Sequence, residues 1–183
     1  MYSLLSRLSR CALLSVMVLA SLRMRMDGVN LERLKAHIVP LSAAQNFDTA
    51  RFEWDLIFVE ISDEPDHCPC GQQILEHCYI RNRITLRETY VGNVCINRFL
   101  GIDTGNLFDG LKRIRDEVTA NANDAVIEYA QKNGFLFERE YHFLHSTKLK
   151  RRLSAPQLAW KAKINRRILS RTIVRRRTGK AQP

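Results

Sequence analysis

Three features are missing from this sequence, and two of these absences argue against a class of protein. A membrane-spanning helix needs about 20 consecutive apolar residues, and the apolar run of residues 11–22 is too short for one. The patterns HExxH and HxE, which are typical of catalytic zinc sites, do not occur, nor do the usual nucleophile motifs. Acidic residues are absent after Thr147. We therefore expect a binding protein rather than an enzyme or a membrane protein.

Positive charge is concentrated at the two ends of the chain. The 29 Lys and Arg residues exceed the 19 Asp and Glu residues, which gives a formal net charge of +10. From Lys148 onward there are 13 basic residues and no acidic ones, whereas residues 26–147 hold 12 basic and 19 acidic residues. A basic segment separated in this way is typical of proteins that bind a polyanion. This favours DNA or RNA as a partner, with a merely solvated basic surface as the alternative.

Residues 1–25 differ in character from the rest of the chain. They contain four Arg residues and an apolar stretch of the size found in signal peptides, followed by small residues at Ala20 and Ser21. One interpretation is an export signal. The other is that translation starts at Met24 or Met26, because the sequence after Met26 begins like an ordinary cytosolic protein. We favour the second interpretation and expect a cytoplasmic location.

Four of the five cysteines lie between residues 68 and 95. Four thiolates form a complete tetrahedral shell for Zn²⁺, and a CxC pair followed by Gly71 is suited to a metal-binding turn. We predict one structural Zn²⁺ bound by Cys68, Cys70, Cys78 and Cys95. His67 or His77 could replace Cys78, but His77 and Cys78 would point to opposite faces of a strand. Thiols without a metal, either buried or facing solvent, are the alternative.

The patterning predicts an α+β protein with a boundary near residue 103. Residues 51–61 alternate between apolar and charged residues, as in a half-buried strand that ends at SDEPD. Residues 74–83 and 85–91 form a predicted hairpin, and Gly92 precedes a helix that carries Cys95. The region after it is helical in pattern. The predicted segments are a doubtful extension (1–25), a strand and zinc-finger unit (26–102), a helical region (103–174) and a basic disordered tail (175–183).

The last predicted helix combines an apolar side with a cationic side. Trp160, Ile164 and Ile168 recur at helical spacing, and we expect Trp160 to be a core residue. On the hairpin, Tyr79 and Tyr90 are candidates for base stacking. A membrane partner is disfavoured, because the apolar side has Trp160 as its only aromatic residue. The candidate nucleic-acid contacts are Arg81, Arg83, Lys163, Arg166, Arg167, Arg171, Arg175, Arg176 and Arg177.

The order of metal-binding turn, hairpin and helix is that of a treble-clef zinc finger. The motifs CPCGxxI and VGNxCIxxF, followed by LSxxQxxWKxKINRRI, resemble small zinc-knuckle proteins of bacteriophages, prophages and mobile elements. The similarity covers residues 54–175. It implies zinc, a bacterial cytoplasm and nucleic-acid transactions, but no defined activity. We therefore expect a zinc-binding, nucleic-acid-binding accessory protein of phage origin. The alternative is a protein-interaction module, without catalysis, that modulates a host complex.

Overall fold

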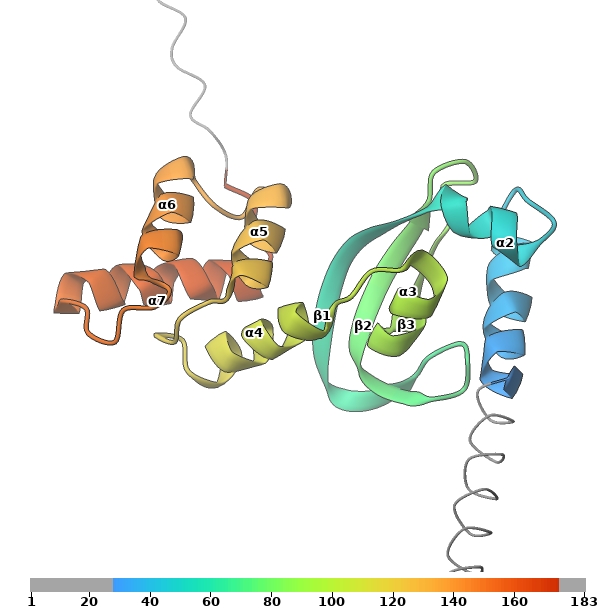
Figure 1. The fold of residues 1–183 in the computed structure, drawn as a ribbon, viewed down its shortest axis with the longest axis horizontal. Coiled ribbons are helices and arrows are strands. Elements are labelled where there is room, and N and C mark those ends of the chain that lie inside the picture. Colours follow the sequence, from blue (N-terminus) through green and yellow to red (C-terminus); the bar gives the residue numbers. More distant parts are fainter. Residues whose placement is uncertain (1–27, 175–183) are drawn as a thin grey trace, which may run out of the picture. The chain divides into compact units, whose positions relative to one another are not determined.

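The computed structural model describes residues 28–174 and divides the chain into two compact units, one ending at Ile102 and one beginning at Asp103 (Figure 1). The fold is α+β, because the first unit is built on an antiparallel sheet and the second consists of helices. No helix within the described residues is long and apolar enough to cross a membrane. Residues 1–25 and 175–183, predicted to be a doubtful extension and a basic disordered tail, lie outside the described residues.

The first unit opens with a helix over residues 28–38, followed by short turns of helix: η1 (Val39–Leu41), α2 (Phe47–Ala50) and η2 (Arg51–Glu53). The side chain of Asn46 caps α2 by accepting a hydrogen bond from the amide of Thr49 at 2.9 Å. The buried carboxylate of Glu53 accepts hydrogen bonds from two amides and one side chain: Ala43 N (2.9 Å), Ala44 N (2.8 Å) and Asn82 Nδ2 (2.7 Å). Glu53 thus joins the loop before the sheet to its second strand.

The sheet contains β1 (Trp54–His67), β2 (Gln73–Asn82) and β3 (Glu88–Gly92), hydrogen-bonded in that order. The predicted hairpin is present, but the predicted end of the first strand at SDEPD is wrong. Strand β1 continues to His67, with a register irregularity between Ile61 and Asp66. Pro65 is tolerated there because β1 is an edge strand, where a missing N–H need not interrupt the ladder.

One face of the sheet forms the core of the first unit with α3 (Asn93–Leu100). Cys78 lies between Val59 and Val91 on the neighbouring strands, and all three are buried. The apolar side of α3 contributes Ile96 and Phe99, which are fully buried. Helix α3 ends at Gly101, whose φ of 71° suits glycine. The first turn of α3 is therefore held at one end of the sheet.

The second unit is formed by α4 (Gly105–Asp116), α5 (Asp124–Lys132), α6 (Glu138–Thr147) and α7 (Ala155–Leu169). In Figure 1, α5 and α6 stand next to each other above α7. Two predicted helix starts are present: Asn123 caps α5 through Val126 N at 3.0 Å, and Ser154 begins α7 in a capping box with Gln157. The core is apolar, with fully buried side chains at Phe108, Ile114, Ile127, Leu144, Ile164 and Ile168.

Candidate metal centre

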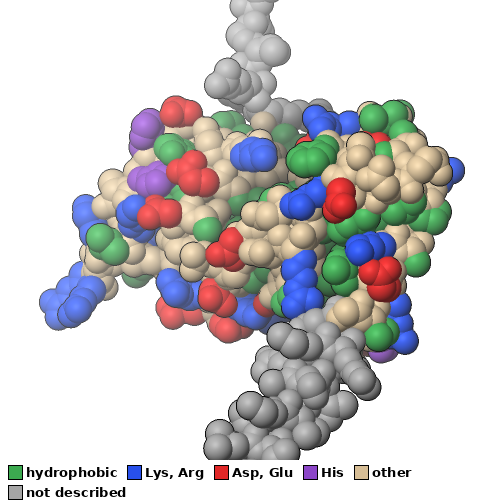
Figure 2. Space-filling view, turned by 45° about the vertical axis from the view of Figure 1, so that its right-hand side comes forward, with side chains coloured by type: hydrophobic (Ala, Val, Ile, Leu, Met, Phe, Trp, Pro, Cys, Tyr) green, Lys and Arg blue, Asp and Glu red, His purple; other side chains and the backbone are tan. Residues whose placement is uncertain are grey.

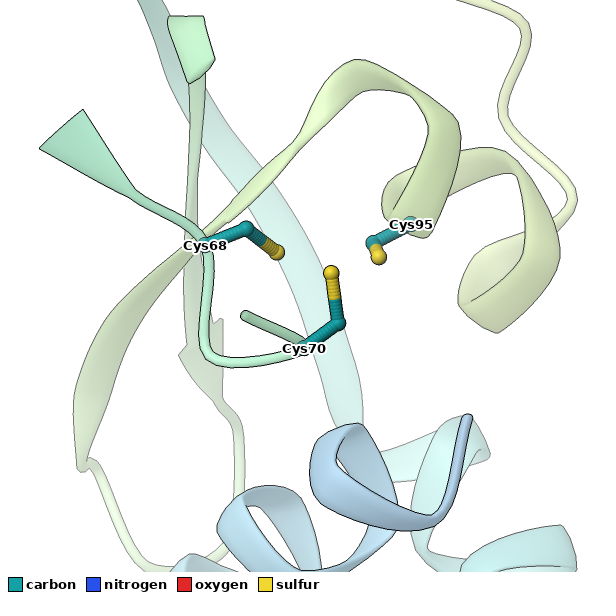
Figure 3. Close-up of side chains that lie close together, drawn as sticks. All are labelled: Cys68, Cys70 and Cys95. Carbon is teal, nitrogen blue, oxygen red and sulfur yellow. The ribbon is translucent and has the colours of Figure 1, made fainter. Parts of the chain in front are cut away.

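Three cysteine side chains converge in the first unit. The sulfur atoms of Cys68, Cys70 and Cys95 all lie within 4.8 Å of one another and point toward a common centre (Figure 3). The residues are 2%, 2% and 7% exposed. Three soft donor atoms held this close and this deep are able to bind a metal ion.

The turn after β1 positions two of these thiols. Cys68 directly follows the strand, and its amide donates to Gln72 O at 2.8 Å. The amide of Gly71 donates to Cys68 O at 2.7 Å, which closes a tight turn around Cys70. Gly71 has a φ of 93°, a conformation that other residues rarely adopt. The CxC-Gly sequence therefore places both sulfurs on the same side of the turn.

The hairpin returns the chain to deliver the third thiol. Gly92 ends β3 and caps α3, so that Cys95 falls in the first turn of that helix. The amide of Gly92 donates to Cys68 Sγ at 3.3 Å. A Cβ on residue 92 would lie 2.8 Å from Ile74 Cγ2, which only a glycine avoids. Both the amide and the N-terminus of α3 favour negative charge on sulfur.

The three thiols do not ionise independently. The pKa of Cys68 lies well below its ordinary value because Cys95 and the amides of Gly92 and Cys70 donate hydrogen bonds to its sulfur. The pKa of Cys95 is raised because its thiol donates to Cys68 and because it is buried. Burial likewise raises the pKa of Cys70. The cluster therefore holds one thiolate readily, and a metal cation is needed to stabilise all three.

The predicted fourth ligand, Cys78, is not part of this group. It is fully buried near the middle of β2, between Val59 and Val91, so its side chain is used in the apolar core. The alternatives are also outside the group. His67 is exposed, and His77 directs Nε2 toward Asp66 Oδ2 at 3.4 Å on the other side of the sheet. Sequence spacing does not distinguish a ligand from a core cysteine.

A pocket of about 420 Å³ adjoins the three thiols. Its apolar wall comes from the helix over residues 28–38, through Leu31 and Leu34, and from Ile74 of β2. Polar side chains complete the lining: Asn30, Gln72, Gln73, Asn93 and Arg98. The sulfur cluster is therefore next to an open space of the size that small-molecule sites occupy.

The structure divides the predicted nucleic-acid contacts of α7 into two groups. Lys163 and Arg166 are exposed. Arg167 is turned inward instead: Nη2 contacts the carboxylate of Glu140, Nε donates to Phe135 O at 2.8 Å, and the guanidinium lies over the ring of Phe137. Arg171, just after α7, is half-buried. The four residues thus do not form one exposed stripe.

The hairpin arginines are exposed but lie beside carboxylates. Arg81 Nε is 3.6 Å from Glu88 Oε1, and Arg83 Nε is 3.4 Å from Asp55 Oδ2. The carboxylate beside each arginine offsets part of its positive charge. The three remaining candidates, Arg175, Arg176 and Arg177, lie outside the described residues.

Sequence reasoning missed the buried polar residues of α7. Lys161 is 2% exposed and bonds through Nζ to Asn121 Oδ1, while Asn165 donates to Val118 O (2.8 Å) and Ala120 O (3.0 Å). The signal was present, since Lys161 lies three residues before Ile164 and Asn165 lies three residues before Ile168, both at helical spacing. Trp160 is only half-buried and stacks on Phe143, with ring centroids 4.3 Å apart.

Comparisons of the chain with protein families, curated proteins and solved structures found no match.

Proposed function

We propose that the chain is a zinc-binding protein that contacts nucleic acid through its helical unit. The observation that carries the metal part is the convergence of three buried thiols from two segments of the chain. In a tetrahedral zinc site, Zn–S bonds of about 2.3 Å place the sulfur atoms about 3.8 Å apart. The 4.8 Å limit on the observed separations requires only small side-chain movements to reach that geometry. Zinc fits a set of donors made of sulfur alone.

The nucleic-acid part rests on the distribution of charge between the units. Residues 103–174 hold 14 Lys and Arg against 8 Asp and Glu, whereas residues 28–102 hold 7 against 10. Figure 2 shows the Lys and Arg side chains of the helical unit, on the left of the view, interspersed with acidic ones. The excess of positive charge in the helical unit supports electrostatic contacts with phosphate groups. The resemblance to phage zinc-knuckle proteins agrees with this role in a bacterial cytoplasm.

Metal content tests the first part. We expect about one zinc per chain in the purified full-length protein, measured by mass spectrometry of the metal. Cys95→Ser removes a buried thiol of the cluster and should lose the metal, whereas Cys78→Ala removes a buried thiol outside it and should keep the metal. Zinc-free wild-type protein, or equal zinc loss in both variants, would overturn the proposed ligand set.

A salt titration tests the second part. Binding of mixed-sequence DNA and RNA is followed by fluorescence anisotropy for two variants with the same change in charge. Lys163→Gln with Arg166→Gln should lower the slope of log affinity against log salt by about 1.8 for duplex DNA. Arg81→Gln with Arg83→Gln should change it little, because Glu88 and Asp55 already lie beside these arginines. Absence of binding at low salt, or an effect confined to the hairpin variant, would contradict the proposal.

Docking of a basic protein segment is a second candidate function, favoured by the outer face of the sheet. The rings of Phe58 and Tyr79 stack with centroids 4.3 Å apart, and Tyr90 lies 5.8 Å from Tyr79. The tyrosine hydroxyls donate to the carboxylates of Glu60 and Asp66 at 2.9 Å each. Aromatic rings beside carboxylates suit a cationic side chain. Binding of a lysine-rich peptide, weakened by Tyr79→Ser, would support this function, and no binding would refute it.

A further inference from the structure

We infer that the metal centre is completed by a ligand from outside the cluster, a small thiol that enters the adjoining pocket. This inference rests on the proposed metal site and identifies what binds there. A tetrahedral ion needs four donors, and a site with three protein ligands keeps its fourth position open for solvent or substrate.

The described part of the chain supplies three donors and no fourth. Within residues 28–174, Cys68, Cys70 and Cys95 are the one group of three or more potential ligands whose donor atoms meet the 4.8 Å limit. Cys78 is held in the core, and His77 faces Asp66. His37 lies on the helix beside the pocket, but it is not among the grouped ligands, and its Nε2 lies 2.8 Å from Thr89 Oγ1. The side chains of residues 28–174 therefore leave one side of the cluster open.

The open side faces the pocket rather than packed chain. All three cysteines contribute to the lining of its volume of about 420 Å³, which is enough for a small organic molecule. Leu31, Leu34 and Ile74 provide an apolar wall, and amide side chains such as Asn30 and Gln72 provide hydrogen-bonding groups. This lining suits a short organic chain that carries polar groups.

Softness favours a thiolate as the donor atom, and nearby positive charge has to accommodate the negative charge that it adds. A divalent ion with three thiolates carries a net charge of −1, and a fourth thiolate makes it −2. Two arginines lie near this charge. Arg98 lines the pocket, and Arg33 Nη1 lies against Gly71, the residue that follows Cys70. In the binding step, the thiol sulfur bonds to the metal, its proton goes to solvent, and the solvent molecule that fills the fourth position leaves. No oxidation or reduction is involved, and soft metals prefer sulfur to oxygen.

The test compares two probes that differ in a single atom. Full-length zinc protein, prepared with a phosphine reductant, is examined by X-ray absorption alone, with 2-mercaptoethanol, and with ethylene glycol. We expect three sulfurs and one oxygen or nitrogen without thiol, four sulfurs with 2-mercaptoethanol, and no change with ethylene glycol. In Co²⁺-loaded protein, the sulfur-to-metal charge-transfer absorbance should rise by roughly one third, the ratio of four thiolates to three.

Four sulfurs before thiol is added would overturn the inference, and repeating the measurement with Cys78→Ala and Cys11→Ser would identify the protein ligand. Scattering from an imidazole, or a spectrum unchanged by 2-mercaptoethanol, would overturn it as well. A protein that binds no metal would instead refute the proposed function, so the two failures are distinguishable. Arg98→Gln should weaken binding of 2-mercaptoethanol several-fold while zinc content stays at one per chain, because it removes a nearby positive charge but no ligand.

Discussion

Replacement of Arg167 should destabilise the helical unit far more than replacement of its neighbour Arg166. Helical spacing in the sequence places both on the cationic side of helix α7, which predicts that replacing either should barely change folding. The structure contradicts this for Arg167, whose side chain is 15% exposed and contacts Glu140, which is 4% exposed. The guanidinium also donates to Phe135 O at 2.8 Å. Arg167 thus links α7 to α6 and to the segment before α6.

The magnitude follows from what Arg167→Gln leaves behind. Removing one member of a buried ion pair typically costs about 3–5 kcal/mol, because the remaining charge is buried without its partner. The carboxylate of Glu140 would retain one hydrogen bond, from Phe137 N at 2.9 Å. The partial exposure of Arg167 would also admit some water. We therefore expect a loss of about 2–4 kcal/mol in the free energy of unfolding of the second unit.

Urea denaturation can measure this loss unit by unit. Trp54 and Trp160 are the two tryptophans of the chain, one in each unit, so a Trp54→Phe background makes fluorescence report on the second unit alone. With a urea m-value of about 1–1.5 kcal/mol/M for a small unit, the midpoint should fall by at least about 1.3 M. Arg166→Gln is the matched control, and its midpoint should change little because Arg166 is exposed.

Equal midpoints for the two variants would refute the reasoning. A double variant, Glu140→Gln with Arg167→Gln, gives an independent check. Removing both charges leaves no buried ion unpaired, so the double variant should be more stable than the sum of the single losses predicts. If the losses simply add, the contact between Arg167 and Glu140 contributes nothing specific.

Three further predictions concern other buried groups. The pKa of Glu53 is lowered mainly by the hydrogen bond from Asn82 Nδ2, so its carboxylate stabilises the first unit above the unfolded pKa of about 4.3. That stabilisation is lost as pH falls through the lower folded pKa. In the variant Glu53→Gln, stability should therefore depend less on pH between pH 6 and 3, as measured by circular dichroism. Gly110→Ala should lower the free energy of unfolding, measured by urea denaturation, by about 1–3 kcal/mol, because the new Cβ would contact Asn123 Oδ1 and lie 2.5 Å from Val126 Cγ2. The control Gly105→Ala should change it little, because the new Cβ would lie near only the flexible side chain of Asp103. Burial lowers the pKa of Lys161, so its charged ammonium group disfavours folding below about pH 10. The variant Lys161→Met should therefore be at least as stable as the wild type in thermal denaturation at pH 7. A clear loss of stability would show that the hydrogen bond from Lys161 to Asn121 dominates.

Local sequence signals predicted those elements whose causes are local. These local signals are the alternation of apolar and charged residues, the reversal at Gly92 and the helix caps at Asn123 and Ser154. Each depends on neighbours in the chain, and the structure has the expected hairpin and helix starts. The continuation of β1 past Ile61 was not predictable in this way, because β2 provides its pairing. The inward turn of Arg167 depends on Glu140 in another helix. A count of four cysteines cannot tell which of them are metal ligands and which are core residues. The structure has Cys78 in the core and outside the group of three thiols.

The position of the thiols on both sides of the hairpin makes a bound metal a reversible cross-link. Cys70 and Cys95 enclose a loop of about 25 residues that contains β2 and β3. Closing a loop of that length in the unfolded chain removes entropy equivalent to about 3.5 kcal/mol at 25 °C, a large fraction of the stability of a small unit. Unlike a disulfide, this cross-link would open and close with the supply of free metal rather than with redox state. The resistance of the hairpin to proteolysis would then depend on metal availability in the cell.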